Sequence, residues 1–95
     1  MTKAQIVAKI SDATGISKKE VELIIEGFIG IIIDCLKNDD SIEIRGFGTF
    51  KNKKREARKA RNPKTGETID LKKRYIPYFK VSKEFKKAVI DSLVK

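Results

Sequence analysis

Histidine is absent from the 95-residue sequence, and cysteine occurs only once. Histidine is the side chain whose ordinary pKa suits it to act as a base near neutral pH, and the lone Cys35 has no histidine to activate it as a nucleophile. The acidic residues lack the spacing of metal ligands, and no glycine-rich phosphate loop is present. We therefore expect no enzyme, no metal site and no cofactor.

A single cysteine also excludes a disulfide within the chain. Cys35 lies among isoleucines, which favours a small buried apolar residue over a reactive thiol. The sequence contains no apolar run long enough to span a bilayer and does not open with a signal-peptide pattern. We expect a soluble, cytoplasmic protein.

Basic residues exceed acidic ones by nine, and the excess lies entirely in the second half of the chain. Residues 1–46 carry six basic and eight acidic side chains, whereas residues 47–95 carry sixteen basic and five acidic ones. The length fits a single domain, residues 1–95, with a small core that oligomerisation would enlarge. Nucleic acid is the partner that such a surface favours, with an anionic membrane as the alternative.

The densest charge lies in residues 51–66, where eight Lys and Arg accompany one acid. Apolar sequence flanks this segment on both sides, so the chain must leave a folded body and return to it. Asn62-Pro63 interrupts the run and Thr65-Gly66 predicts a turn. We interpret residues 51–75 as a cationic hairpin, an arm that holds a polyanion.

Two helices are predicted in the first half. Thr2 and Gln5 form a capping-box pattern before a helix over residues 3–14, and Gly15 is a plausible stop. A second capping box precedes a helix over residues 18–37. After Glu26 this helix is nearly apolar all round, so it must be buried on more than one side by a sheet, a second copy of the chain, or both.

The second half predicts strands and one helix. The alternation of residues 41–45 is typical of a strand, and a tight bend follows at residues 46–48. Ser82 is a favourable N-cap for a last helix. The outgoing strand starts at residue 49, and the chain returns through residues 67–71 and 75–81. The fold class is α+β, in the order α-α-β-β-arm-β-α.

Three segments resemble the bacterial HU and integration host factor family. They are Arg45-Gly46-Phe47-Gly48-Thr49-Phe50, Arg58-Lys59-Ala60-Arg61-Asn62-Pro63-Lys64-Thr65-Gly66-Glu67 and Ile76-Pro77-Tyr78-Phe79-Lys80. The likeness covers essentially the whole chain. It implies an intertwined dimer with a helical base and a β-sheet saddle, formed by residues 1–50 and 76–95. Two β-ribbon arms, residues 51–75 of each chain, would reach into the minor groove of DNA, which is the established behaviour of HU and integration host factor.

The charge pattern and the resemblance together give a set of candidate DNA contacts. These are Lys3, Arg45, Lys53, Arg55, Arg58, Lys59, Arg61, Asn62, Pro63, Lys64, Lys73, Arg74, Lys80, Lys83 and Lys86. The resemblance implies that Pro63 is an apolar wedge that kinks the duplex, and its alternative role is that of a turn residue. Asn62 and Arg61 can read the narrow minor groove, or can belong to the turn.

Several of these residues have a simpler interpretation as well. The alternative role of Lys53, Arg55, Arg58 and Lys59 is that of a solubilising edge that blocks strand aggregation. A regular strand would place Lys53, Arg55 and Lys59 on one face of the arm and Lys54 and Arg58 on the other. Lys80 and Lys83 bracket a helix N-terminus, where phosphates bind readily, although both could be solvated. Lys3 can touch phosphate or pair with an acid such as Glu26.

The aromatic residues favour the core over base stacking. Phe47, Phe50 and Phe79 flank glycines at strand bends, and the long helix needs aromatic cover. Two departures from the family stand out, namely Val81-Ser82-Lys83 where many members have Pro-Gly-Lys, and the bulky Tyr75 and Tyr78. The pattern assigns no role to these tyrosines.

The sequence thus predicts a histone-like architectural protein that binds and bends double-stranded DNA and is associated with the nucleoid. A basic RNA-binding or ribosome-associated protein is the alternative, and it would show exposed aromatics on a sheet. A membrane-surface module would need a basic helix with a free apolar face. Homodimer or heterodimer, and HU-like unspecific or integration-host-factor-like site-specific binding, stay open.

Overall fold

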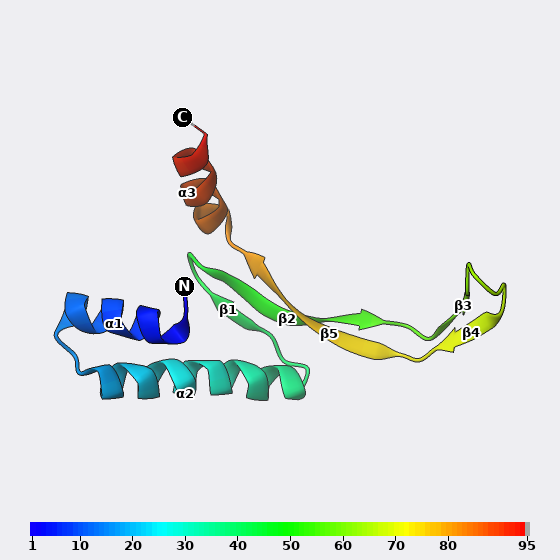
Figure 1. Cartoon of the computed structure of the whole chain (residues 1–95), viewed down its shortest axis with the longest axis horizontal. Helices are drawn as coiled ribbons and strands as arrows, with labels where there is room; N and C mark the ends of the chain where they lie inside the picture. Colours follow the sequence, from blue (N-terminus) through cyan, green and yellow to red (C-terminus); the bar gives the residue numbers. More distant parts are fainter. Residues whose placement is uncertain (95) are drawn as a thin grey trace. The chain divides into compact units, whose positions relative to one another are not determined.

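The computed structural model describes residues 1–94, which form two compact units, Met1–Asp34 and the chain from Cys35 onward. The helices are α1 (Lys3–Thr14), α2 (Lys18–Lys37) and α3 (Lys83–Leu93), and α2 runs from the first unit into the second (Figure 1). The strands are β1 (Ile42–Ile44), β2 (Gly48–Arg55), β3 (Arg58–Arg61), β4 (Thr68–Leu71) and β5 (Arg74–Val81). The predicted α+β class and the predicted order of elements are confirmed.

Helix α1 has the predicted boundaries because its caps form. The Thr2 hydroxyl accepts a hydrogen bond from the Gln5 backbone N–H at 3.3 Å, and the Gln5 side chain accepts one from the Thr2 N–H at 2.8 Å. Gly15 ends the helix in the left-handed conformation, with φ of 76°, which glycine adopts without steric cost.

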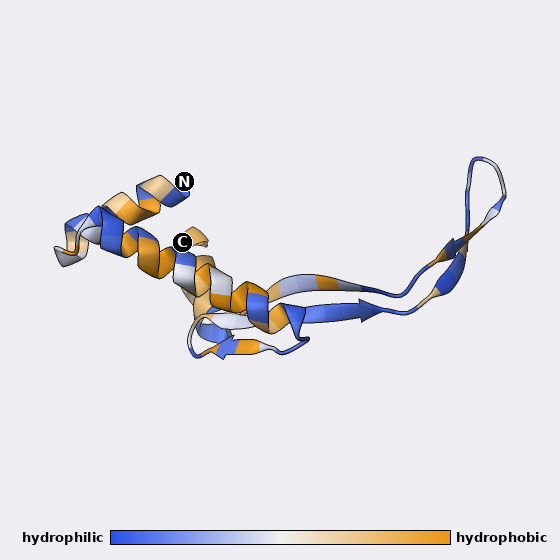
Figure 2. Ribbon diagram, turned by 90° about the horizontal axis from the view of Figure 1, so that it is seen from below, coloured by the Kyte–Doolittle hydropathy of each residue, from blue (hydrophilic) through white to orange (hydrophobic). Residues whose placement is uncertain are grey.

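Helix α2 is apolar over most of its surface but buries little of it (Figure 2). Its buried residues are Val21 and Ile32, while Leu23, Ile24 and Ile31 are each more than 60% exposed in the single chain. Cys35, which the sequence predicts to be buried, is half-buried. One chain therefore leaves a large apolar surface of α2 in contact with water.

The second unit contains two antiparallel sheets. One is three-stranded in the order β1-β2-β5, and the other pairs β3 with β4. The ladder between β2 and β5 runs from Gly48 opposite Val81 to Arg55 opposite Arg74. The shorter ladder runs from Arg58 opposite Leu71 to Arg61 opposite Thr68.

An aromatic cluster joins the sheet to α3. The Phe79 ring lies 4.8 Å from that of Phe47 and 4.5 Å from that of Phe50, and the Phe85 ring lies 5.8 Å from Phe47. The rings of Phe47, Phe50 and Phe79 pack against one another, as the core interpretation expects, but each of the three residues is only half-buried in the single chain. Ser82 caps α3 by accepting a hydrogen bond from the Phe85 N–H at 3.0 Å, so the departure from Pro-Gly-Lys preserves the helix start.

The arm is not one regular ribbon, and this corrects the predicted alternation of its charges. β2 ends at Arg55 and β3 begins at Arg58, while β4 ends at Leu71 and β5 begins at Arg74. Because the strand restarts after two residues, the period of two does not carry across the break. Arg55 and Arg58 consequently line the same hollow instead of opposite faces.

Candidate nucleic-acid interface

The register between β2 and β5 separates the side chains of this ribbon into two faces. Residues directly opposite each other in an antiparallel pair lie on the same face, and successive residues alternate. One face, which we call the cationic face, therefore carries Lys51, Lys53, Arg55, Arg74 and Lys80. The sequence-based list omitted Lys51, although its spacing of two from Lys53 could have placed it there.

Tyr78 lies within the cationic face, opposite Lys51. The Lys53 ammonium is 4.4 Å and the Lys51 ammonium 5.5 Å from the centre of its ring. The pKa of the Tyr78 hydroxyl is lowered, mainly by a hydrogen bond with Lys51, and the charges of Lys51, Lys53 and Lys80 add to this. The Tyr78 ring therefore interacts with the ammonium groups of two lysines of the cationic face, a role that the sequence did not predict.

The opposite face of the ribbon is used within the protein. The Asn52 side-chain amide donates to the Leu36 carbonyl at 2.8 Å and to the Asp39 carboxylate at 3.1 Å. The Lys54 ammonium lies 3.1 Å from Glu56, and a hydrogen bond with that carboxylate is the main cause of the raised pKa of Lys54. Lys54, which is not among the candidate DNA contacts, thus forms an ion pair with Glu56.

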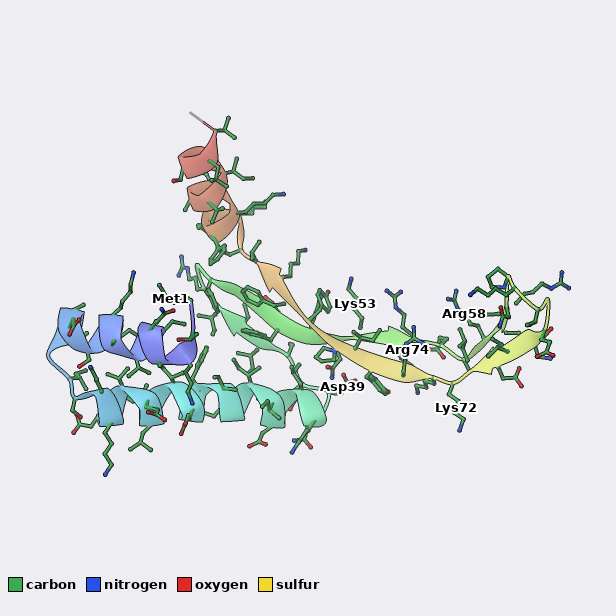
Figure 3. All side chains as sticks on the ribbon, viewed as in Figure 1. Met1, Asp39, Lys53, Arg58, Lys72 and Arg74 are labelled. Atoms are coloured by element: carbon green, nitrogen blue, oxygen red, sulfur yellow. The ribbon has the colours of Figure 1, made fainter. Side chains whose placement is uncertain are left out.

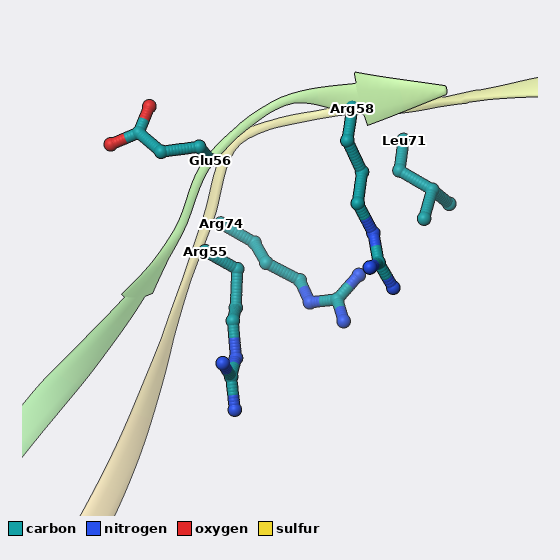
Figure 4. A pocket seen from close by; sticks show the side chains of 5 residues that line it. All are labelled: Arg55, Glu56, Arg58, Leu71 and Arg74. Carbon is teal, nitrogen blue, oxygen red and sulfur yellow. The ribbon is translucent and has the colours of Figure 1, made fainter. Parts of the chain in front are cut away.

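Three arginines meet where the ribbon is interrupted. A hollow of about 450 Å³ is lined by Arg55, Glu56, Arg58, Leu71 and Arg74. Figure 4 shows the three guanidiniums on one side of the ribbon, while the Glu56 carboxylate points to the other side. Figure 3 labels three basic residues along the arm, with Lys53 nearest the body, then Arg74, and Arg58 furthest out. Lys73 lies in the interruption between β4 and β5, with its ammonium 5.7 Å from the centre of the Tyr75 ring.

The tip of the arm is a turn built around Asn62. Its backbone N–H donates to the Glu67 carbonyl at 2.8 Å, and its carbonyl accepts from the Gly66 N–H at 2.7 Å. Its side-chain oxygen accepts from the Lys64 N–H at 2.9 Å. The alternative role of Asn62 as a turn residue is therefore present in the structure, and Pro63 lies exposed at the tip.

The remaining candidates occupy three places. Lys59 and Arg61 lie on β3, opposite Asp70 and Thr68. Arg45, Lys80 and Lys83 line one hollow of about 330 Å³ beside the start of α3, together with the acids Glu43 and Glu84. Lys86 lies exposed on α3.

Lys3 belongs to the first unit, where its simpler interpretation is confirmed. Its ammonium lies 3.0 Å from Glu26 and 3.9 Å from Glu22. A hydrogen bond with Lys3 lowers the pKa of Glu26, and the same bond raises the pKa of Lys3. An exposed ion pair of this kind contributes little to stability.

An α+β fold with a cationic β-ribbon places this chain in the class of basic proteins whose surface suits a polyanion. The model of the family described as bacterial DNA-binding protein matches residues 1–90, and the chain belongs to that family. Integration host factor subunit beta of Teredinibacter turnerae is 40% identical over 98% of this chain and 96% of its own length. DNA-binding protein HU 2, derived from the SPbeta prophage of Bacillus subtilis, is 43% identical over 94% of this chain and 97% of its own.

Solved structures agree with this assignment. The chain superimposes on Anabaena HU from a cocrystal with DNA with a TM-score of 0.81 and 29% identity, covering 94% of this chain and 97% of that one. An HU mutant of Thermotoga maritima gives a TM-score of 0.72 at 27% identity. The predicted family and HU-like fold are confirmed, and the family comprises DNA-binding proteins rather than enzymes.

Two observations bear on the other function classes. No helix within residues 1–94 combines the length and apolar character that crossing a membrane requires. In the same part of the chain, no group of three or more Cys, Asp or Glu side chains is arranged to hold a metal ion.

Proposed function

We propose that this protein is a dimeric, nucleoid-associated architectural protein that binds double-stranded DNA and bends it. The cationic face carries the proposal, because it places five Lys and Arg side chains along one side of the β2–β5 ribbon, and the arm beyond that ribbon ends in an exposed proline. The names of its relatives, among them DNA-binding protein HU 2 and an HU solved with DNA, support DNA as the polyanion that this face binds.

Binding would be dominated by phosphate contacts. Lysine and arginine neutralise phosphates and release condensed counterions, which makes affinity strongly salt-dependent. Such contacts position a protein without reading sequence directly. The charge-rich face therefore favours HU-like unspecific binding over site-specific bending, which is the alternative within the family.

Bending is the finer part of the proposal. An apolar ring inserted between base pairs costs a few kcal/mol of stacking per kinked step, and the longer contact path of a bent duplex offsets that cost. The exposed Pro63, at the tip and without a charge or an N–H donor, suits such a wedge in the minor groove.

The RNA-binding alternative receives less support. Phe47, Phe50 and Phe79 pack against one another instead of presenting open rings on the sheet. Tyr78 is the aromatic residue on the cationic face, and two lysines approach its ring. A duplex RNA and a single strand belong in the binding assay as competitors.

The dependence of affinity on salt tests the binding claim. We expect log K to fall linearly with log salt for unrelated duplexes, with a slope of about −0.9 per neutralised phosphate. Arg58→Ala should weaken binding to all duplexes alike and should reduce the steepness of the slope by the amount that corresponds to about one phosphate contact. Lys54→Ala is the matched control, because it removes one charge from the opposite face. Equal slopes for the parent and both variants, or preference for RNA, would contradict the proposal.

A further inference from the structure

Both strands of the arm are interrupted at the same level. Residues 56–57 separate β2 from β3, and residues 72–73 separate β4 from β5 (Figure 1). The long ladder closes with Arg55 opposite Arg74, and the tip ladder opens with Arg58 opposite Leu71. The tip hairpin is therefore attached to the body ribbon by two short connections without ladder pairing between them, which makes this joint the natural place for the arm to bend.

The joint concentrates positive charge that the protein itself does not neutralise. Arg55 and Arg74 are directly opposed, and like charges in that position destabilise a sheet. Arg58 lines the same hollow from the tip ladder, with its guanidinium on the same side of the ribbon as that of Arg74 (Figure 4). Within residues 1–94 no carboxylate lies within 4.0 Å of these three guanidiniums, and the carboxylate of Glu56 is bound to Lys54.

We propose that the hollow at the joint is a binding site for a phosphate-type oxyanion that locks the tip hairpin to the body ribbon. Guanidinium forks match the oxygens of phosphate in bidentate geometry. Arg55 and Arg74 belong to one ladder and Arg58 to the other, so an anion held by all three bridges the break. Leu71 supplies an apolar wall. The anion is a phosphodiester of the DNA backbone, which rests on the proposed function, or a free phosphate, which does not.

A titration of the full chain with inorganic pyrophosphate tests the site without DNA. At constant ionic strength, we expect saturable NMR shifts of the Ala57, Lys72 and Lys73 amides. Hydrogen exchange of the β3 and β4 amides should become slower, because the tip is then fixed. Sodium chloride at the same ionic strength should produce neither effect.

Charge-matched variants decide whether the three arginines form the site. Arg74→Gln and Arg58→Gln should each weaken pyrophosphate binding about tenfold, as expected for a lost charge-assisted hydrogen bond. Lys87→Gln removes one charge from α3, but Lys87 neither lines the hollow nor belongs to the candidate DNA contacts, so its effect should stay within about twofold. Equal effects of all three variants, or shifts spread over every lysine, would overturn the proposal. Circular dichroism confirms that each variant is folded.

Competition with a duplex separates the two sources of phosphate. If a saturating duplex displaces pyrophosphate, a backbone phosphodiester occupies the site; if both bind together, a free anion is its ligand. If the duplex binds while pyrophosphate does not, and Arg74→Gln binds the duplex no more weakly than Lys87→Gln, the joint site is overturned and the proposed function stands. Pyrophosphate binding without any duplex binding overturns the proposed function and leaves the joint site standing.

Discussion

Gly48 occupies the tightest position that the structure shows for any glycine of the chain. A Cβ placed there would meet the Lys80 carbonyl oxygen and would lie 2.6 Å from two carbons of the Phe79 ring. The ring cannot retreat easily, because it packs against Phe47 and Phe50. Gly48 therefore permits the close approach of β2 to β5 on which the aromatic cluster depends.

Replacing Gly48 by alanine should destabilise the protein by about 2–3 kcal/mol, as overpacking in a filled core does. Gly46→Ala is the control, because Gly46 has φ of 81° but no atom within 4 Å of its Cβ position. Its loss should be about 1 kcal/mol, the cost of the left-handed conformation alone. Chemical denaturation measures both values. Equal losses would show that the Phe79 contact does not limit this site.

The sequence predicted the chemistry of single residues better than their orientation. The pairing of Lys3 with Glu26 and the packing of the phenylalanines followed from residue type and spacing. The engagement of Lys54 by Glu56 and the support of Lys51 by Tyr78 did not. The Tyr78 contact depends on the register between β2 and β5, which local sequence leaves open, and the Lys54–Glu56 pair forms where β2 ends at Arg55.

Among the elements, α2 and β2 are tied together by one side chain. The two hydrogen bonds of the Asn52 amide reach the Leu36 carbonyl in the last turn of α2 and the Asp39 carboxylate just beyond it. Helix C-termini leave carbonyls without intrahelical partners, so this amide satisfies one of them. The bond also fixes the end of α2 against the body end of the arm.

Asn52→Ala should lower the free energy of unfolding by about 1–2 kcal/mol, because a partly buried carbonyl loses its partner. Asn52→Asp should cost more, since it removes both donors and adds a negative charge beside Asp39. Lys54→Ala, on the same face of β2 but exposed, should change stability by less than about 0.5 kcal/mol. Thermal unfolding of the three variants checks the order. An Asn52→Ala variant as stable as Lys54→Ala would mean that this contact contributes nothing.

Helices were predictable at the scale of elements because their caps are local. Thr2, Gly15 and Ser82 each act within a few residues of the helix that they delimit. The joint in the arm was not predictable, because Glu56-Ala57 and Lys72-Lys73 carry no turn signal. Only the pairing of two distant segments shows that both interruptions fall at one level.

For the whole molecule, the exposed apolar surface of α2 supports the proposed dimer. If a second chain covers it, the midpoint of unfolding should rise with protein concentration. Ile31→Gln sharpens this test, because Ile31 is 62% exposed in the single chain. In a monomer the substitution should change stability by less than about 0.5 kcal/mol, whereas burial in an interface makes the loss several times larger. A concentration-independent midpoint, with a monomer mass in sedimentation, would contradict the dimer.

Bending of DNA is the central claim, and energy transfer between dyes at the two ends of one duplex measures it most directly. At saturating protein we expect transfer to rise on binding, and to rise less with Pro63→Ala, which keeps every charge of the arm but shrinks the wedge. Lys64→Ala, one residue further along the tip, should require more protein to saturate but should then bend the duplex as fully as the parent. A saturated complex whose energy transfer equals that of free DNA would contradict the account.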